Sequence, residues 1–131
     1  MFNLNEQAAA AAAQEAGVTV DLIAPGGKDV LARITLAGPD SRRAIEARRE
    51  AWRHVFAKRE GDKTEIGDAE TKEAGTRFLA GCVISWDGFT ADGEAPLDCT
   101  LDNVLAVFGQ VPWVESACDL KIGNRANFTQ A

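Results

Sequence analysis

The chain has 131 residues, of which 46% are hydrophobic and 26% charged, and its formal net charge is −6. This length and balance fit one folded domain and exclude a chain that is disordered throughout. An acidic chain without a dense basic tract repels a phosphate backbone, so we expect no nucleic acid partner. No uninterrupted apolar run approaches the roughly 18 residues that a membrane span needs, so no membrane contact is expected.

The first 16 residues are rich in alanine and have no basic leader at their start. Residues 5–16 combine high helix propensity with almost no large apolar face, which predicts a short, fraying helix that ends near Gly17. We therefore expect a flexible or helical segment over 1–16, followed by a single α+β domain over 17–131. The missing leader predicts a protein that stays in the cytosol where it is made.

A β-hairpin is predicted directly after this segment. Val18, Val20 and Leu22 alternate with polar residues, Pro25-Gly26-Gly27-Lys28 interrupts the pattern, and branched and apolar residues resume over 30–36. Alternation on both sides of a turn is typical of paired antiparallel strands. The same turn lacks the Lys-Ser/Thr ending and following helix of a phosphate-binding loop, so we do not interpret it as one.

The first long helix is predicted to begin at Asp40 or Ser41, either of which can cap its free N–H groups. Its apolar stripe consists of large residues at three-, four- and seven-residue intervals with small ones beside them, namely Ile45, Trp52 and Phe56 with Ala44, Ala51 and Val55. The charged stretch 59–73 contains two glycines and is predicted to be a loop or frayed helix ends.

Three more helices are predicted in the second half. Phe78, Cys82 and Trp86 fall at i, i+4 and i+8, which predicts a helix from about Glu70 to near Trp86. Thr100 is a good N-cap for a third helix that ends at Gly109, and a fourth runs from Pro112 to Gly123. The predicted fold class is α+β, with an N-terminal β-hairpin followed by a mainly helical body of about four helices.

The sequence offers no pattern of catalytic or metal-ligating residues. His54 is the only histidine, and the three cysteines, Cys82, Cys99 and Cys118, are widely spaced without a CxxC pair. Buried, reduced thiols are the simplest interpretation of such cysteines. The acidic turn over 87–94 lacks the ligand alternation of a calcium loop. We expect no catalytic residue, no metal and no cofactor.

Two sets of short motifs, in this order, resemble the tail assembly chaperones of long-tailed bacteriophages and prophages. The front set is the segment Gly17 to Leu22, then Pro25-Gly26-Gly27, then Val30 to Leu36, then Gly38-Pro39-Asp40-Ser41 before an arginine-rich helix. The back set is Val83-Ile84-Ser85-Trp86-Asp87-Gly88-Phe89, the Gly-Glu-x-Pro-Leu run over 93–97, Asn103-Val104-Leu105, Pro112-Trp113-Val114 and Asn127-Phe128. The resemblance covers roughly residues 15–129.

The resemblance implies a protein without enzymatic activity that holds the tape measure protein until the tail tube polymerises around it. It also implies self-association, residence in the cytoplasm of the bacterial host and, in many members, a longer form made by frameshifting. One alternative is a structural tail or capsid accessory protein that is retained in the virion. Another is a small enzyme or toxin-like regulator whose site is assembled from scattered carboxylates.

Four large apolar residues are candidates for contact with the partner, because they lie beside predicted turns or near a terminus. They are Trp86, Phe89, Trp113 and Phe128. Tryptophan is enriched at binding hot spots but is also common in cores, so the alternative is that all four close the core.

Overall fold

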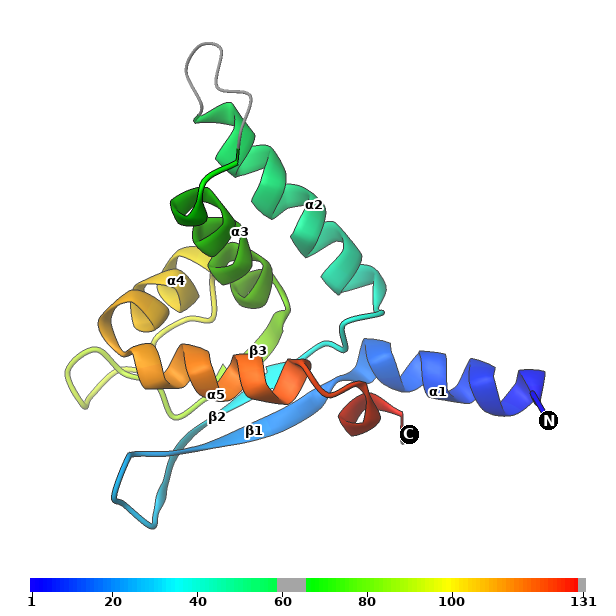
Figure 1. The fold of residues 1–131 in the computed structure, drawn as a ribbon. Helices are drawn as coiled ribbons and strands as arrows, with labels where there is room; N and C mark the ends of the chain where they lie inside the picture. Colours follow the sequence, from blue (N-terminus) through cyan, green and yellow to red (C-terminus); the bar gives the residue numbers. More distant parts are fainter. Residues whose placement is uncertain (59–65, 130–131) are drawn as a thin grey trace.

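The computed structural model describes residues 1–58 and 66–129, which form an α+β fold (Figure 1). Five α-helices, one short 3₁₀ helix and three strands occur within these residues. The elements, in chain order, are α1 (Leu4–Ala16), β1 (Val18–Ile23), β2 (Val30–Leu36), α2 (Arg42–Ala57), α3 (Asp68–Gly81), β3 (Val83–Asp87), α4 (Leu101–Gln110), α5 (Pro112–Ile122) and η1 (Arg125–Phe128).

The sheet is antiparallel, with the order β1-β2-β3. The predicted hairpin is confirmed as β1 and β2, and four α-helices follow it in the described residues. The hairpin is not the first element, however, because α1 precedes it. Gly17 separates the two elements with a φ of +78°, and a Cβ there would lie 2.2 Å from the Leu36 carbonyl oxygen, so only glycine fits this junction without strain.

The predicted helix to Trp86 is wrong, because α3 ends at Gly81 and the chain continues as β3. Trp86 pairs with Ile34 of β2 in this ladder. Cys82 is the C-cap of α3 in the αR conformation, and only Val83 to Asp87 are extended, with Val83 opposite Leu36 after a register shift in the ladder. The β-branched Val83 and Ile84 favour a strand once β2 offers a free edge.

Helix α3 also begins earlier than predicted, because its start was expected at about Glu70. Asp68 is the first residue of α3, so the later part of the predicted loop 59–73 is helical, whereas 59–65 lie outside the described residues. Gly67 stands at the N-cap, and Asp68 and Glu70 in the first turn complement the positive end of the helix dipole.

The predicted buried stripe of α2 is confirmed for its small residues Ala44, Ala51 and Val55 but not for its large ones. Ser41 caps the helix as expected, since its Oγ accepts a hydrogen bond from the Ala44 N–H at 3.0 Å. The buried residues of α2 are small, namely Ala44, Ala47, Ala51 and Val55, whereas Ile45 and Phe56 are 43% and 49% exposed. These small residues let α3 approach α2 closely. A Cβ added to Gly81 of α3 would lie only 2.6 Å from the Ala47 Cβ, so no larger residue fits there without a shift.

The core lies on one face of the sheet. Val20, Leu22, Ala32, Ile34 and Leu36 point to this face and are buried, and α5 contacts both β1 and β2. The opposite face is polar: one row across the strands is Asp21, Arg33 and Asp87, in which the Arg33 Nε lies 3.0 Å from the Asp21 Oδ1. One buried face and one solvated face are usual for an antiparallel sheet.

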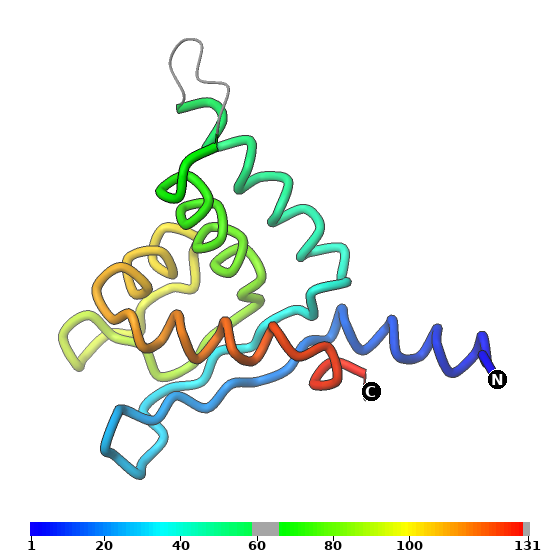
Figure 2. Tube along the Cα trace, in the orientation of Figure 1, coloured from blue at the N-terminus to red at the C-terminus, as the bar shows by residue number. Residues whose placement is uncertain are grey.

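The C-terminal end of α1 is clamped to the body through Gln14, which is only 6% exposed. Its backbone oxygen accepts a hydrogen bond from the Gly38 N–H at 2.8 Å, and its Oε1 accepts one from the Asp40 N–H at 3.2 Å. Its Nε2 donates to the Phe128 oxygen at 3.5 Å. The rest of α1 projects from the body, as the tube in Figure 2 shows.

The cysteines divide into two kinds. Cys82 and Cys118 are buried in the core, whereas Cys99 is exposed, so the prediction of a buried thiol is confirmed for two of the three and wrong for Cys99. Burial raises the pKa of both core thiols to about 12.

We predict that a thiol reagent at pH 8 labels one cysteine per folded chain. Cys82 and Cys118 are buried, which shields their sulfurs and raises their pKa to about 12, whereas Cys99 is exposed, so only Cys99 should be accessible to the reagent. The absorbance of released thionitrobenzoate counts the reacted thiols, and unfolding in urea should raise the count to three. Fast reaction of two or three thiols in the folded chain would contradict the core packing.

Candidate partner-binding groove

An apolar groove lies between the β-hairpin, the segment after β3 and the junction of α4 with α5. Its volume is about 490 Å³, and none of its fifteen lining residues is charged. In a chain with 26% charged residues, such an uncharged lining favours an apolar occupant. The lining residues are Leu22, Leu31, Ala32, Gly88, Phe89, Thr90, Ala91, Leu97, Asn103, Ala106, Val107, Gln110, Val111, Trp113 and Val114.

Phe89 lines one wall of this groove, and Trp86 supports it without being a lining residue. Their rings are stacked, with centroids 4.3 Å apart, and Phe89 lines the groove while Trp86 packs behind it. The Trp86 Nε1–H donates to the Leu97 oxygen at 2.8 Å, and the Leu97 N–H donates to the Phe89 oxygen at 2.8 Å. Trp86 therefore ties the two ends of the segment 89–97 together and holds Phe89 in place.

The opposite wall comes from α4 and α5. Trp113 lies in the first turn of α5, where Pro112 occupies the first helical position and needs no N–H donor there. Trp113 is partly buried and packs against the core with one side while it lines the groove with another. Ala106 and Gln110 of α4 are exposed and form the outer rim.

Phe128 does not belong to this surface. Its side chain is fully buried in η1 and forms part of the hydrophobic core. Of the four predicted contact residues, the fold thus brings Phe89 and Trp113 to one groove, supports them with Trp86 and places Phe128 in the core.

Sequence reasoning missed several lining residues, among them Leu31, Leu97 and Ala106. Leu31 could have been recognised as a candidate from the sequence, because it is a large apolar residue at a position of β2 where the alternation predicts an exposed polar one. Ala106 and Leu97 offered none, since their position depends on how β3 directs the following segment.

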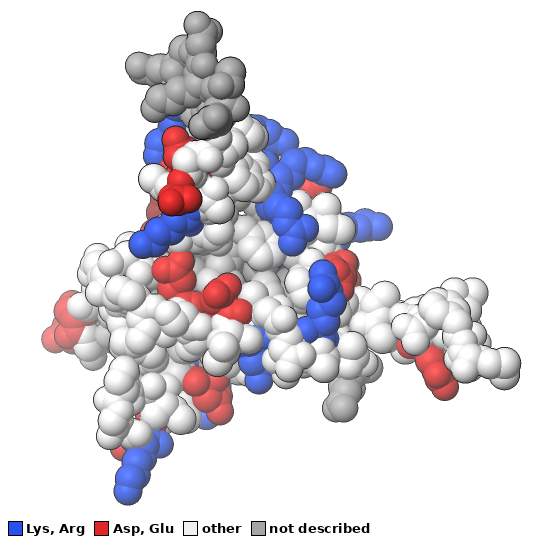
Figure 3. All heavy atoms as spheres, viewed as in Figure 1, with Lys and Arg blue, Asp and Glu red and all other residues white. Residues whose placement is uncertain are grey.

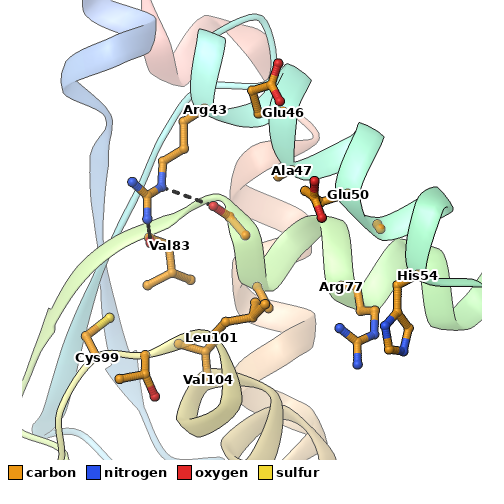
Figure 4. Close-up of a pocket in the computed structure, with 14 residues that line it drawn as sticks. Arg43, Glu46, Ala47, Glu50, His54, Arg77, Val83, Cys99, Leu101 and Val104 are labelled. Carbon is orange, nitrogen blue, oxygen red and sulfur yellow. Dashed lines mark hydrogen bonds between the residues drawn. The ribbon is translucent and has the colours of Figure 1, made fainter.

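A second cleft of about 380 Å³ lies between α2, α3 and the start of α4 (Figure 4). Arg43 crosses its end and donates to the Gly81 oxygen at 3.1 Å and to the Val83 oxygen at 2.9 Å. Figure 4 shows His54 beside Arg77 at one end and Cys99 at the other, so the imidazole and the thiol do not form a pair.

Desolvation raises the pKa of Cys99 above its ordinary value, which disfavours the thiolate. Within residues 1–58 and 66–129, no three His, Cys, Asp or Glu side chains come together in a way that could hold a metal ion.

In comparisons with protein-family models, with curated proteins and with solved structures, the chain gives no significant match. The resemblance to tail assembly chaperones therefore stays a prediction from the sequence motifs. Among the described helices, none has the length and apolar character needed to cross a membrane.

We predict that Phe128→Ala lowers the free energy of unfolding by about 3–5 kcal/mol, because it leaves a cavity under a fully buried ring. Urea denaturation followed by tryptophan fluorescence measures this change. The matched control is Leu120→Ala on α5, which is 82% exposed and should alter stability by less than about 0.5 kcal/mol. Equal effects of the two substitutions would contradict the assignment of Phe128 to the core.

Proposed function

We propose that the protein is a phage tail assembly chaperone, without catalysis of its own, that binds the tape measure protein and keeps it soluble during tail assembly. The groove between the hairpin and the α4–α5 junction is the proposed client site. The proposal rests on the sequence motifs together with this groove. Phe89 and Trp113, two of the four residues predicted to contact the partner, line its walls.

The observation that carries the proposal is the uncharged, aromatic lining of an open surface groove. A helix buries its apolar stripe when it lies in such a groove, and each square ångström of apolar area removed from water contributes about 25 cal/mol. Phe89 and Trp113 supply the large flat surfaces that dominate many binding sites. A long helical client that aggregates through its apolar faces fits this surface.

The lack of charge in the groove also suits a client with many similar segments. Ion pairs fix the register and the identity of a partner, whereas apolar contacts tolerate different side chains of similar size. The groove therefore accepts successive apolar stripes along one long helix. Several copies of the chaperone can then cover a single tape measure protein.

We predict that Ala106→Glu abolishes this activity while the fold remains intact. Ala106 is exposed on the groove rim, so the free protein should tolerate the new carboxylate in water. When a helix docks, the carboxylate loses its water without gaining an opposite charge or a hydrogen bond, which is unfavourable. The measurement is the soluble fraction of the long helical protein encoded downstream, co-expressed with this chain and recovered through a tag on it. The control is Ala57→Glu, an exposed position at the end of α2 outside the groove.

The expected result is a soluble complex with the unaltered chain and with Ala57→Glu, but not with Ala106→Glu. Equal recovery with both variants would contradict the groove as the client site. Failure of the unaltered chain to solubilise the client would contradict the proposed function. Detection of the chain in purified particles would instead favour the structural tail or capsid accessory protein.

A further inference from the structure

We propose that the outer side of α2 is a second binding surface, which takes an acidic amphipathic helix of another protein. This surface, the arginine face, consists of Ile45, Arg48, Arg49, Trp52, Arg53 and Phe56. It lies apart from the groove, because no residue of α2 lines the groove. Its binding therefore does not depend on whether the protein is a chaperone.

The large apolar side chains of α2 lie outside the core. Ile45 and Phe56 are 43% and 49% exposed, and Trp52 is only partly buried. Positions 45, 52 and 56 are seven and four residues apart, a spacing that aligns them along one side of a helix. The ring centroids of Trp52 and Phe56 are 5.6 Å apart, so the two rings form one continuous patch. Single exposed apolar residues are common, whereas three in a row at helical spacing indicate a contact surface.

Arginines flank this apolar row on both sides. With about 100° of rotation per residue, Arg49 and Arg53 fall along one side of the row and Arg48 along the other. The Arg48 guanidinium lies over the ring of Phe78 in α3, 4.8 Å from its centroid, which holds it at the edge of the row. Tryptophan and arginine are the residue types most enriched at binding hot spots, and the arginine face contains both.

The charge of α2 is opposite to that of the whole chain. It holds five of the fourteen basic residues but only two of the twenty acidic ones. Both glutamates, Glu46 and Glu50, line the second cleft, on the neighbouring side of the helix. They pair with Arg49 and Arg53 in exposed ion pairs, which contribute little and can exchange for others. Figure 3 shows basic side chains gathered over α2, at the upper right of the molecule.

An acidic amphipathic helix matches both the charge and the shape of this face. Each of its carboxylates can accept two hydrogen bonds from a guanidinium, while its apolar stripe covers Ile45 and Trp52. An uncharged segment would desolvate the arginines without a partner, and the net charge of −6 opposes a nucleic acid. The row from Ile45 to Phe56 extends roughly 16 Å along α2, so the partner helix needs about three turns.

Two synthetic peptides of about 18 residues, long enough to form a helix, test the proposal. Both carry leucines along one side, and the other side carries glutamates in one peptide and lysines in the other. Fluorescence anisotropy of each labelled peptide, titrated with the full chain, gives its affinity. The net charge of −6 alone would favour the lysine peptide. The arginine face should reverse this order, so the glutamate peptide should bind about tenfold more tightly.

Charge variants locate the binding on α2. Arg49→Gln with Arg53→Gln should weaken binding of the glutamate peptide about fivefold, because two guanidinium partners are lost. The matched control is Lys28→Gln with Lys72→Gln, which removes the same charge at exposed positions outside the face. It should change the affinity by less than about twofold, since distant surface charges are screened by salt.

An apolar variant separates docking from simple charge attraction. Ile45→Gln keeps every charge of the face but loses its apolar contact, so it should also weaken binding of the glutamate peptide. Leu120→Gln, at a position of α5 that is 82% exposed, is the control and should leave the affinity unaltered. Both positions are exposed, so circular dichroism should show the same helix content in both variants.

Four results would overturn the proposal. The glutamate peptide binds no more tightly than the lysine peptide, or the arginine and lysine variants weaken it equally. A single-stranded DNA oligonucleotide binds more tightly than the glutamate peptide, which would assign the face to nucleic acid. Ala106→Glu abolishes binding while the arginine variant does not, which would place the peptide in the groove. Client solubilisation tests the proposed function separately, because Ala106→Glu leaves α2 unaltered.

Discussion

Antiparallel pairing of β3 with the central strand β2 determines where the walls of the groove lie. It places Trp86 opposite Ile34 on the core face, from which the indole N–H reaches the Leu97 oxygen and the ring stacks on Phe89. The segment after β3 is thereby held beside the hairpin, where Gly88 takes a φ of +89° close to the Leu31 oxygen. Without this pairing, α4 and α5 would have no fixed wall to face.

The α+β class, the hairpin and the starts of α2, α4 and α5 were predictable, because each depends on local signals such as alternation, Ser41, Thr100 and Pro112. The third strand was not, since the sequence 83–87 fits either period and only the free edge of β2 decides between them. For the same reason the sequence could select Phe89 and Trp113 as candidates but could not show that they share a groove, or that Phe128 fills the core.

If the protein is a chaperone of this kind, the groove itself contacts the client. Hydrogen exchange of the full chain, measured with and without the tape measure protein, tests this contact. Exchange should slow on binding over 88–91 and 103–113, which carry both walls of the groove, and should not change in α2. Protection confined to the cleft between α2 and α3, with 88–91 and 103–113 unaltered, would contradict it.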